Sequence, residues 1–594
     1  MCGIFFYKGR KYSMKTLEKY FKRLYHRGPE NTYYEQFCDG LITLGFHRLT
    51  IVGLDQFSMQ PFFKSYNGSE NEITNESQSG KFAKKGHRYG SMVNGEIYNY
   101  KDLQKRYNLE ITSNCDCDII LEMFFKFGIE KTVSHLDGTF SLVIADLTSS
   151  EYIVARDPIG IKPMYYYVED DNHFFVSEMK AIPEDLENVM MFPVGSYYTS
   201  SSGKFFSYFD VKDGFEKSHI DPFWINKYNQ DSPAPFDYTI DTLDADIDKN
   251  CLKIAKNVRK LFLGAVRKRL MSDRPIGCIL SGGLDSTLIT ALVKKVYDQP
   301  LHTYTVGLKG SEDLHYAKIA SEHIGTDHHE LLITPEEYVD AIDETIYQIE
   351  SYDVTTVRAS IGNYLVSQFV KKIGKNIVIY CGDVSDEIFG GYRGFGKTEC
   401  GDKLDQENVK MLNNIQYFDV LRSDKTISSA TLDARVPFAD KNLLLYVMSI
   451  PGEYKRFDQK MEATYRLKFD KGDAAWSKEK YKLMEKQILR NAFSDILPEE
   501  LLWRRKEAFS DGIAKKEYSA FNYIKDFVES RYSDDEFLEK CQKYKHCTPY
   551  DKESLYYREI FEKHYPNRSQ IIPFFWRHPF SDNVDPSARL LDNY

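Results

Sequence analysis

The chain has 594 residues, of which 42% are hydrophobic, and a formal net charge of −10. This length exceeds what one hydrophobic core usually supports and predicts two or three domains, while the acidic charge argues against nucleic acid as an extended partner. No run reaches the ~18–20 apolar residues of a membrane-spanning helix and no signal segment opens the chain, so the sequence predicts a soluble, cytoplasmic protein.

The second residue is the first candidate for chemistry. Removal of the initiator methionine from Met1-Cys2-Gly3 would leave Cys2 with a free amine and a thiol on one residue. A thiol has a pKa near ~8.5 and an α-amine near ~8, so the amine can take the proton of the thiol. Cys2 is therefore a candidate nucleophile, although a cysteine at this position in other chains is usually inert.

Residues 1–205 are predicted to form a layered α+β domain. Short apolar, aromatic-rich runs predict strands, at 140–145, 152–155 and 173–176. Helical periodicity predicts two helices, at 14–25 and 119–127. The polar stretch 64–86 predicts an exposed loop. Cys115-Asp116-Cys117 is spaced more tightly than a usual zinc half-site and has no matching pair, which favours reduced thiols over a zinc site.

The pattern changes after a polar segment at 206–250, which predicts an interdomain linker. Compact apolar runs then alternate with helical periodicities, with strands predicted at 276–280, 301–306 and 377–380 and helices through 266–267 and from 286 and 314. This βαβ pattern predicts a parallel sheet with right-handed crossovers. The chain beyond about residue 410 is predicted to be mainly helical. We assign the second domain to 251–530 and a C-terminal tail to 531–594.

A glycine-rich loop follows the first of these strands. Ser281-Gly282-Gly283-Leu284-Asp285-Ser286 ends a strand and opens a helix, where backbone N–H groups can surround a phosphate. It lacks the lysine and spacing of GxxxxGK[ST], so γ-phosphate transfer is not implied. The loop is similar to the pyrophosphate loop of enzymes that split ATP into AMP and pyrophosphate; a purely structural glycine turn is the alternative.

An acidic loop follows the strand at 377–380. In Cys381-Gly382-Asp383-Val384-Ser385-Asp386-Glu387, carboxylates come directly after the strand end. The carboxyl ends of parallel strands meet at one edge, so both loops are expected to face one cleft. Mg²⁺ prefers hard oxygen ligands, and Asp285 and Asp386 are its candidate ligands. A solvated acidic turn is the alternative.

The sequence closely resembles the glutamine-hydrolysing asparagine synthetases over nearly its whole length. Eight motifs occur in the order found in that family, at residues 2–4, 26–30, 47–52, 94–99, 156–160, 281–286, 352–360 and 432–438. The resemblance implies an N-terminal-nucleophile, class II glutaminase domain, an αββα sandwich over residues 1–205. It also implies an α/β parallel-sheet ATP-pyrophosphatase domain of the adenine-nucleotide alpha-hydrolase-like type.

For the first domain, the resemblance implies that Cys2 attacks the side-chain amide of glutamine. Asn94 and the Gly95 N–H would stabilise the oxyanion, an interaction typically worth ~3–4 kcal/mol of barrier. Arg48 would hold the α-carboxylate of glutamine as a bidentate cation. The α-ammonium would be received by Asp116 and the region of Glu96, and the pocket would be completed by Leu49, Thr50, Ile51 and Val52. The alternative is that Arg48 and Asp116 are surface charges.

For the second domain, the resemblance implies that the β-carboxylate of aspartate attacks the α-phosphorus of ATP. Ammonia delivered through the interior from Cys2 would then convert β-aspartyl-AMP to asparagine, with release of AMP, pyrophosphate and glutamate. The implied ATP contacts are Leu280, Ser281, Gly282, Gly283, Asp285, Ser286, Val306, Cys381 and Gly382. Thr355, Thr356 and Arg358 would hold aspartate. Lys486 would stabilise charge on the transferring phosphate, with a solvated helix lysine as the alternative. Relatives are often dimers, so the resemblance also implies a homodimer.

The sequence departs from the family at one informative place. Where the family usually has Ser-Gly-Glu-Gly-Ser-Asp-Glu, this chain has Cys381-Gly382-Asp383-Val384-Ser385-Asp386-Glu387. The acid that contacts the intermediate is one methylene shorter, and a misplacement of ~1 Å can cost ~100-fold in rate. We expect Asp383 to keep the catalytic role with altered efficiency.

Three other functions stay open at this point. A relative of the same build could amidate a different carboxylate, although the intact Cys2 and residues 352–360 favour glutamine and aspartate. A regulatory homologue could bind nucleotide without turnover, which the change at Val384 suggests. A nucleic-acid-modifying ATP pyrophosphatase is disfavoured by the acidic charge.

Overall fold

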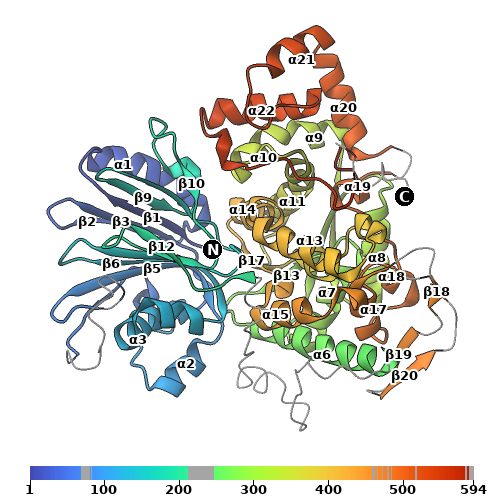
Figure 1. Ribbon diagram of the computed structural model, residues 1–594, viewed down its shortest axis with the longest axis horizontal. Helices are drawn as coiled ribbons and strands as arrows, with labels where there is room; N and C mark the ends of the chain where they lie inside the picture. Colours follow the sequence, from blue (N-terminus) through green and yellow to red (C-terminus); the bar gives the residue numbers. More distant parts are fainter. Residues whose placement is uncertain are drawn as a thin grey trace.

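The structure is a computed structural model that describes residues 1–68, 81, 83–211, 247–457, 462–463, 466–470, 473–477, 481–482, 484–515, 518–581, 583 and 585–587. Two halves lie side by side (Figure 1): an N-terminal half built on antiparallel sheets and a C-terminal half built around a parallel sheet. None of the described helices is long and apolar enough to cross a membrane.

The N-terminal half contains two six-stranded antiparallel sheets. The first has the order β10-β8-β9-β1-β3-β2, with β1 Gly3–Lys8, β2 Asn31–Phe37, β3 Ile42–Arg48, β8 Tyr165–Glu169, β9 Asn172–Val176 and β10 Met190–Met191. The second has the order β12-β11-β7-β6-β5-β4, with β4 Phe62–Ser65, β5 Arg88–Ile97, β6 Gly138–Asp146, β7 Tyr152–Arg156, β11 Ser196–Thr199 and β12 Lys204–Ser207. The predicted strands at 140–145, 152–155 and 173–176 are confirmed as β6, β7 and β9.

Alternation of side chains along the strands builds four layers. In β1, Ile4 and Phe6 pack between the two sheets, against Val143 of β6 among others, while Phe5 and Tyr7 face the helical side. There they pack with α1 (Met14–Phe21), which Ser13 caps by accepting from the Thr16 N–H at 3.2 Å. Helices α2 (Tyr100–Tyr107) and α3 (Ile119–His135) cover the outer face of the second sheet (Figure 1). The predicted αββα sandwich is confirmed.

Two sequence predictions in this half need adjustment. The helix predicted at 14–25 is wrong beyond Phe21, because the chain tightens into a 3₁₀ turn over Lys22–Arg27. This turn brings the buried Arg27 inward, where its Nε donates to the carbonyl oxygen of Cys2 at 3.0 Å. The loop predicted at 64–86 lies largely outside the described residues, since 69–80 and 82 are not described.

The C-terminal half is built on one five-stranded parallel sheet of order β15-β14-β13-β16-β17. Its strands are β13 Ile276–Ile279, β14 His302–Leu308, β15 Asp327–Ile333, β16 Val378–Tyr380 and β17 Asp433–Arg435. Helices α7 (Leu284–Val296) and α8 (Glu312–Ile324) connect consecutive strands, which confirms the predicted βαβ pattern. The edge strands β15 and β17 were not predicted, because β15 carries mostly polar residues and β17 is only three residues long.

Helices surround this sheet and extend beyond it (Figure 1). They are α6 Ile247–Lys268, α7 Leu284–Val296, α8 Glu312–Ile324, α9 Pro335–Asp340, α10 Ile342–Ile349, α11 Val354–Ile373, α12 Ser385–Phe389, α13 Gly401–Asn414, α14 Asp419–Ser429, α15 Lys441–Ser449, α16 Gly452–Lys455, α17 Gln487–Ala492, α18 Glu499–Leu502, α19 Phe509–Gly512, α20 Ala520–Arg531, α21 Asp534–Cys541 and α22 Lys552–His564. Two short ribbons pair β18 Glu462–Ala463 with β21 Tyr481–Lys482 and β19 Arg466–Asp470 with β20 Asp473–Ser477. Of the predicted linker at 206–250, residues 212–246 lie outside the described part of the chain.

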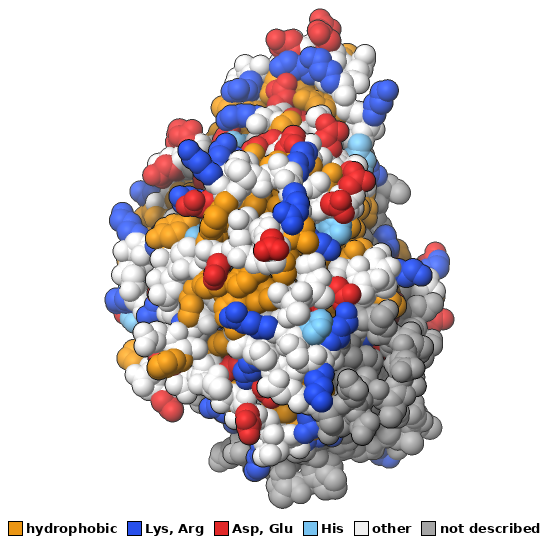
Figure 2. Space-filling view, turned by 90° about the vertical axis from the view of Figure 1, so that its left-hand side faces the viewer, with side chains coloured by type: hydrophobic (Ala, Val, Ile, Leu, Met, Phe, Trp, Pro, Cys, Tyr) orange, Lys and Arg blue, Asp and Glu red, His pale blue; other side chains and the backbone are white. Residues whose placement is uncertain are grey.

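The outer face of the N-terminal half mixes both signs of charge. Figure 2 shows Lys and Arg side chains interspersed with Asp and Glu around a central group of apolar side chains. On the described part of this face, no single sign of charge forms a continuous surface.

Candidate active sites

Cys2 directly precedes β1, and its backbone is anchored by Asn94 of β5. The backbone N–H of Cys2 donates to Oδ1 of Asn94 at 2.9 Å, and its Sγ lies 3.8 Å from the carbonyl oxygen of Leu49. The Nδ2 of Asn94 is fully buried and has no hydrogen-bond partner among the described residues. A buried amide donor without a partner is costly, so this group is available to an oxygen of a bound ligand.

Gly95 brings the strand close to its neighbour. Its φ is +144°, and a Cβ at this position would lie 1.9 Å from the carbonyl oxygen of Thr139. Because no other residue fits here, the bend that presents Asn94 beside Cys2 depends on this glycine.

A small cavity lies next to Cys2. Its lining includes most of the predicted glutamine-binding residues, namely Arg48, Leu49, Ile51, Val52, Gly95, Glu96 and Asp116. Arg48 is buried, and its guanidinium donates to the carbonyl oxygens of Gly53 and, at 3.2 Å, Asp55, so backbone groups hold it in place. Thr50 and Asn94 do not line the cavity; the backbone N–H of Thr50 donates to Glu30 at 2.7 Å.

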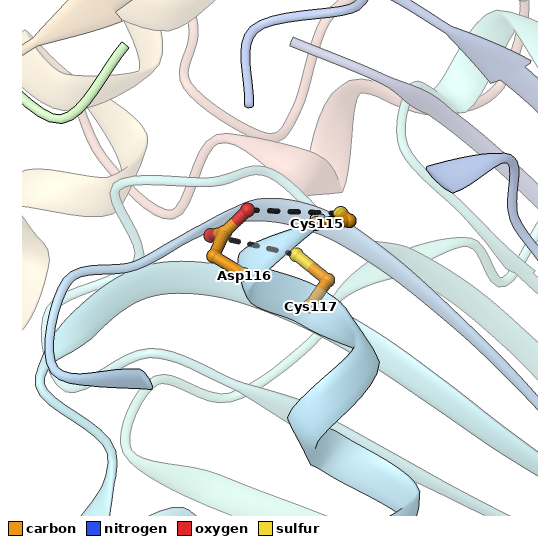
Figure 3. A group of neighbouring side chains, drawn as sticks. All are labelled: Cys115, Asp116 and Cys117. Atoms are coloured by element: carbon orange, nitrogen blue, oxygen red, sulfur yellow. Dashed lines mark hydrogen bonds between the residues drawn. The ribbon is translucent and has the colours of Figure 1, made fainter. Parts of the chain in front are cut away.

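Each carboxylate oxygen of Asp116 faces one thiol, that of Cys115 or Cys117, as Figure 3 shows. Cys115 Sγ lies 3.7 Å from Asp116 Oδ1 and Cys117 Sγ 3.7 Å from Oδ2, and Oδ2 also accepts from the Ile97 N–H at 2.6 Å. Burial raises the pKa of Asp116 to about 7. A hydrogen bond to Cys115 and burial raise the pKa of Cys117 well above its usual value, which agrees with the expected reduced thiols.

Burial also raises the pKa of the Cys2 thiol above its ordinary value. The thiol therefore needs a proton acceptor before it can act as a nucleophile near neutral pH. Among the described residues, no side-chain base bonds to Cys2 Sγ, which instead contacts the backbone carbonyl oxygen of Leu49.

The predicted phosphate loop joins β13 to α7. Gly282 has a φ of +71°, and a Cβ there would lie 2.4 Å from the backbone of Tyr316, so only glycine fits. Gly283 is the N-cap of α7, and Ser281 Oγ lies 3.0 Å from Ser286 Oγ. Hydroxyls and the N–H groups of a helix start together form a favourable environment for a phosphate.

Two lysines neutralise the candidate metal ligands. Lys486 Nζ lies 2.6 Å from Asp285 Oδ2 and 2.6 Å from Asp386 Oδ1, and Lys506 Nζ lies 2.7 Å from Asp386 Oδ2. Burial opposes ionisation of Asp386, but the charges of Lys486 and Lys506 outweigh it and lower the pKa of the carboxyl. Two carboxylates that share one buried cation are close enough to share a divalent ion, so this oxygen set fits Mg²⁺.

The loop that departs from the family pattern has two unusual features. Asp383 accepts from the guanidinium of Arg422 and, at 2.7 Å, from the hydroxyl of Ser423. Val384 has a φ of +76° and a ψ of −14°, a left-handed conformation that costs an L-residue roughly 1–2 kcal/mol and suits glycine better. The backbone at this position therefore has the conformation that suits the glycine usual in the family, although a β-branched valine occupies it.

The two loops lie on one cavity of about 200 Å³. Its lining includes the predicted residues Ser281, Gly283, Asp285, Ser286, Thr355, Thr356, Cys381, Gly382, Asp383, Asp386 and Lys486. Thr355 Oγ1 is buried without a partner among the described residues, whereas Thr356 Oγ1 donates to Asp353 at 2.7 Å.

The structure does not bring four predicted residues to this cavity. Leu280 and Val306 are buried, at 0% and 1% exposure, and Gly282 packs on Tyr316. Arg358 is bound by two carboxylates, with Nε and Nη2 2.7 Å and 2.6 Å from Glu553 and Nη1 3.1 Å from Asp585.

Several cavity residues were missed by sequence reasoning. They are Arg422, Arg504, Lys506, Trp576 and His578. They lie in the mainly helical region or the tail, where we identified no sequence motif that marks them. The tail, which had no assigned role, closes one side of the cavity.

A buried network of charges joins the two halves. We call Arg27, Glu96, Lys162, Asp424, Asp433 and Arg435 the interdomain ion cluster. Lys162 Nζ lies 3.1 Å from Asp433 and 3.5 Å from Glu96, and Arg435 Nη2 lies 3.7 Å from Glu96. Arg27 Nη2 lies 2.9 Å from Asp424. The carbonyl oxygen of Arg435 accepts from the N–H of Cys381 at 3.0 Å. One residue therefore touches both the pocket of Cys2 and the loop of Asp383.

Comparisons with known proteins cover the whole chain. The family model described as asparagine synthase matches residues 257–404 and 397–582, and that of the glutamine amidotransferase domain matches residues 1–201. The chain is similar to the asparagine synthetase (glutamine-hydrolyzing) of Gallus gallus, at 35% identity over 100% of this chain and 99% of that relative. The Homo sapiens relative of the same name is 33% identical, again over 100% and 99%. A solved glutamine phosphoribosylpyrophosphate amidotransferase from B. subtilis covers 56% of this chain and 91% of its own, with 12% identity and a TM-score of 0.29.

Proposed function

The chain belongs to the glutamine-hydrolysing asparagine synthetase family, and we propose that its two cavities together make asparagine from aspartate, with glutamine as nitrogen donor and ATP as the source of free energy. The observation that carries this proposal is the pairing of Cys2 with Asn94, whose buried Nδ2 lacks a partner among the described residues, in a chain that also holds the phosphate loop.

At the first site, we propose that Cys2 Sγ attacks the side-chain amide carbon of glutamine. The thiol proton goes to the α-amine that removal of Met1 would free, and then to the leaving nitrogen, which departs as ammonia. The oxyanion would accept from Nδ2 of Asn94 and from the Gly95 N–H. Water then hydrolyses the thioester, which releases glutamate and restores the thiol.

The substrate contacts at this site follow from the charges of the cavity. Arg48, held by backbone carbonyls, would bind the α-carboxylate of glutamine, and Asp116 with the nearby Glu96 would bind the α-ammonium. Leu49, Ile51 and Val52 would enclose the chain between them. An ammonium partner favours the ionised form of Asp116 and so offsets the burial that raises its pKa.

At the second site, we propose that the β-carboxylate of aspartate attacks the α-phosphorus and pyrophosphate leaves. Ammonia then attacks the carbonyl carbon of β-aspartyl-AMP and displaces AMP. Lys486 and Lys506 would stabilise charge on the phosphates, and Ser281 and Ser286 would bind pyrophosphate. Asp285 and Asp386 would hold Mg²⁺, which supplies positive charge to the phosphates when bound.

The structure favours unequal roles for the predicted aspartate-binding residues. Thr355 lines the cavity, its hydroxyl has no partner among the described residues, and it is the proposed direct contact. Thr356 and Arg358 bond to Asp353 and to Glu553, so we propose that they position this wall. Asp383, tethered by Arg422, would contact the intermediate.

Ammonia must cross from one cavity to the other. We propose that it travels through the interior beside Arg435, whose side chain faces Glu96 and whose carbonyl oxygen bonds to Cys381. We further propose that the enzyme works in the cytoplasm, with a glutaminase domain over 1–205, a linker over 206–250 and a synthetase domain from 251. A homodimer is proposed from the family alone; light scattering after size-exclusion chromatography tests it.

A mass-spectrometric product assay tests the function. Wild-type protein and Cys2→Ala receive Mg-ATP and aspartate, with nitrogen supplied as glutamine or as ammonium. We expect asparagine and AMP from either source in the wild type, and from ammonium alone in Cys2→Ala. Cys38→Ala, which changes a thiol outside the cavity, serves as the matched control. Glutamate release without asparagine or AMP would contradict aspartate as the acceptor, and a panel of other carboxylates would follow.

A further inference from the structure

Two histidines and an aspartate converge at the amino ends of β14 and β15. His302 and Asp327 are directly opposite in this parallel pair, and Asp327 and His329 lie on one face of β15 because they are two residues apart. The possible metal-binding atoms of His302, Asp327 and His329 lie close together. Among the described residues, these three form one of two groups of His, Cys, Asp or Glu side chains that could hold a metal ion. Both candidate active sites involve other residues.

The three ligand atoms form a triangle of the size that a transition metal requires. His302 Nδ1 lies 2.9 Å from Asp327 Oδ2, His329 Nε2 lies 3.3 Å from His302 Nδ1, and His329 Nε2 lies 3.6 Å from Asp327 Oδ2. A tetrahedral Zn²⁺ ion with bonds of about 2.0–2.1 Å has neighbouring ligands roughly 3.3–3.4 Å apart. The observed sides bracket this value, so one ion can reach all three atoms with small side-chain movements.

The surroundings hold the imidazoles in position and leave access from solvent. The ring of His329 stacks on that of Tyr304, with centroids 5.2 Å apart and planes 22° apart. His302 and His329 side chains are 17% and 18% exposed, whereas that of Asp327 is 52% exposed. Burial lowers the pKa of His329, which favours the neutral imidazole that a metal needs. Without a metal ion, the Asp327 carboxylate pairs with Lys375, whose Nζ lies 3.1 Å from Oδ2.

We propose that His302, Asp327 and His329 bind one divalent transition-metal ion of the Zn²⁺ or Ni²⁺ class, with water in the remaining position. The residue set, two imidazoles and one carboxylate, is one that such ions accept. The ion ties β15, which forms the edge of the parallel sheet, to its neighbour β14. An edge strand held by fewer hydrogen bonds than a central one gains most from such a link.

Zn²⁺ titration of the metal-stripped, full-length protein tests the proposal. The variants are His329→Gln and His302→Gln, and His328→Gln is the matched control because its side chain points to the other face and contacts Thr303 at 2.9 Å. We expect the wild type and His328→Gln to bind one more equivalent of Zn²⁺ than the other two, or to bind it at least tenfold more tightly. Comparison between variants cancels any binding by the free thiols.

Two further measurements make the test decisive. Lys375→Met removes the competing cation and should tighten Zn²⁺ binding several-fold, since Lys375 no longer competes with the metal for the Asp327 carboxylate. Circular dichroism and thermal melting without metal check that each variant folds, and asparagine synthesis should be unchanged in all of them. Equal stoichiometry and affinity in the wild type, His329→Gln and His302→Gln would overturn the proposal.

Discussion

Asn94 offers the sharpest test of the glutaminase site. Its Oδ1 anchors the Cys2 N–H at 2.9 Å, while its Nδ2 is buried and lacks a partner among the described residues. Asn94→Ala removes both the anchor and the proposed oxyanion donor. Loss of one such donor typically lowers kcat by about 10²–10³-fold, which corresponds to ~3–4 kcal/mol of barrier. We therefore expect glutamine-dependent asparagine formation to fall by this factor.

Ammonium provides the internal control for the same variant. Asn94 does not line the synthetase cavity, so ammonium-dependent synthesis should stay within about twofold of wild type. Asn94→Asp at pH 8 separates the two roles, because an ionised carboxylate keeps the acceptor for the Cys2 N–H and loses the donor. It should be as slow with glutamine as Asn94→Ala. Recovery of wild-type turnover in Asn94→Asp would refute the oxyanion role and leave anchoring as the only function.

Three other predictions test the remaining parts of the mechanism. Lys486→Met removes the cation shared by two carboxylates, so AMP formation should fall at least ~100-fold with either nitrogen source, while glutamate release persists. A matching loss of glutaminase activity would contradict the placement of Lys486 in the synthetase site alone. Burial raises the folded pKa of Asp116 from 3.8 to about 7, so its ionised form destabilises the fold and the protein gains stability as pH falls from 7 toward 4. In urea unfolding, Asp116→Asn should therefore be more stable than wild type at pH 8, by up to about 4 kcal/mol, and no more stable than wild type near pH 4. Its KM for glutamine should be raised. A stability advantage that does not depend on pH would contradict the buried carboxylate. Arg435→Met leaves Glu96 short of a cation and should lower the free energy of unfolding by about 3 kcal/mol. It should also raise the ratio of glutamate to asparagine above one, as measured by mass spectrometry. An unchanged ratio would remove Arg435 from ammonia transfer.

The sequence predicts best where local pattern decides structure. The apolar run at 140–145 becomes the buried centre of β6, and the glycines at 282 and 283 form the turn that their spacing indicates. Such features depend on side-chain alternation or on a backbone conformation that only glycine adopts. For the same reason the phosphate loop could be identified from its glycines, whereas the role of Asn94 beside Cys2 was implied only by the family resemblance.

Other features depend on contacts between distant residues. Arg358 carries the family motif, but Glu553 and Asp585 from the tail bind its guanidinium. Lys506 pairs with Asp386 across 120 positions, and no periodicity signals that contact. The helix predicted at 14–25 also ends early, because the turn after Phe21 serves the buried contacts of Arg27, which sequence pattern does not reveal.

The interdomain ion cluster limits how far the two halves can be treated as modules. Lys162 and Glu96 belong to the N-terminal half and Asp433 and Arg435 to the other, and all four are buried. Cutting the chain between 211 and 247 and separating the pieces would remove the cross-partners of these charges and expose to water the apolar side chains of both halves that pack together, which weakens each piece. The two halves should therefore unfold in one transition, and a truncated glutaminase should express poorly. Engineering of either half alone, and evolutionary exchange of a half with a relative, would both have to preserve this charged interface.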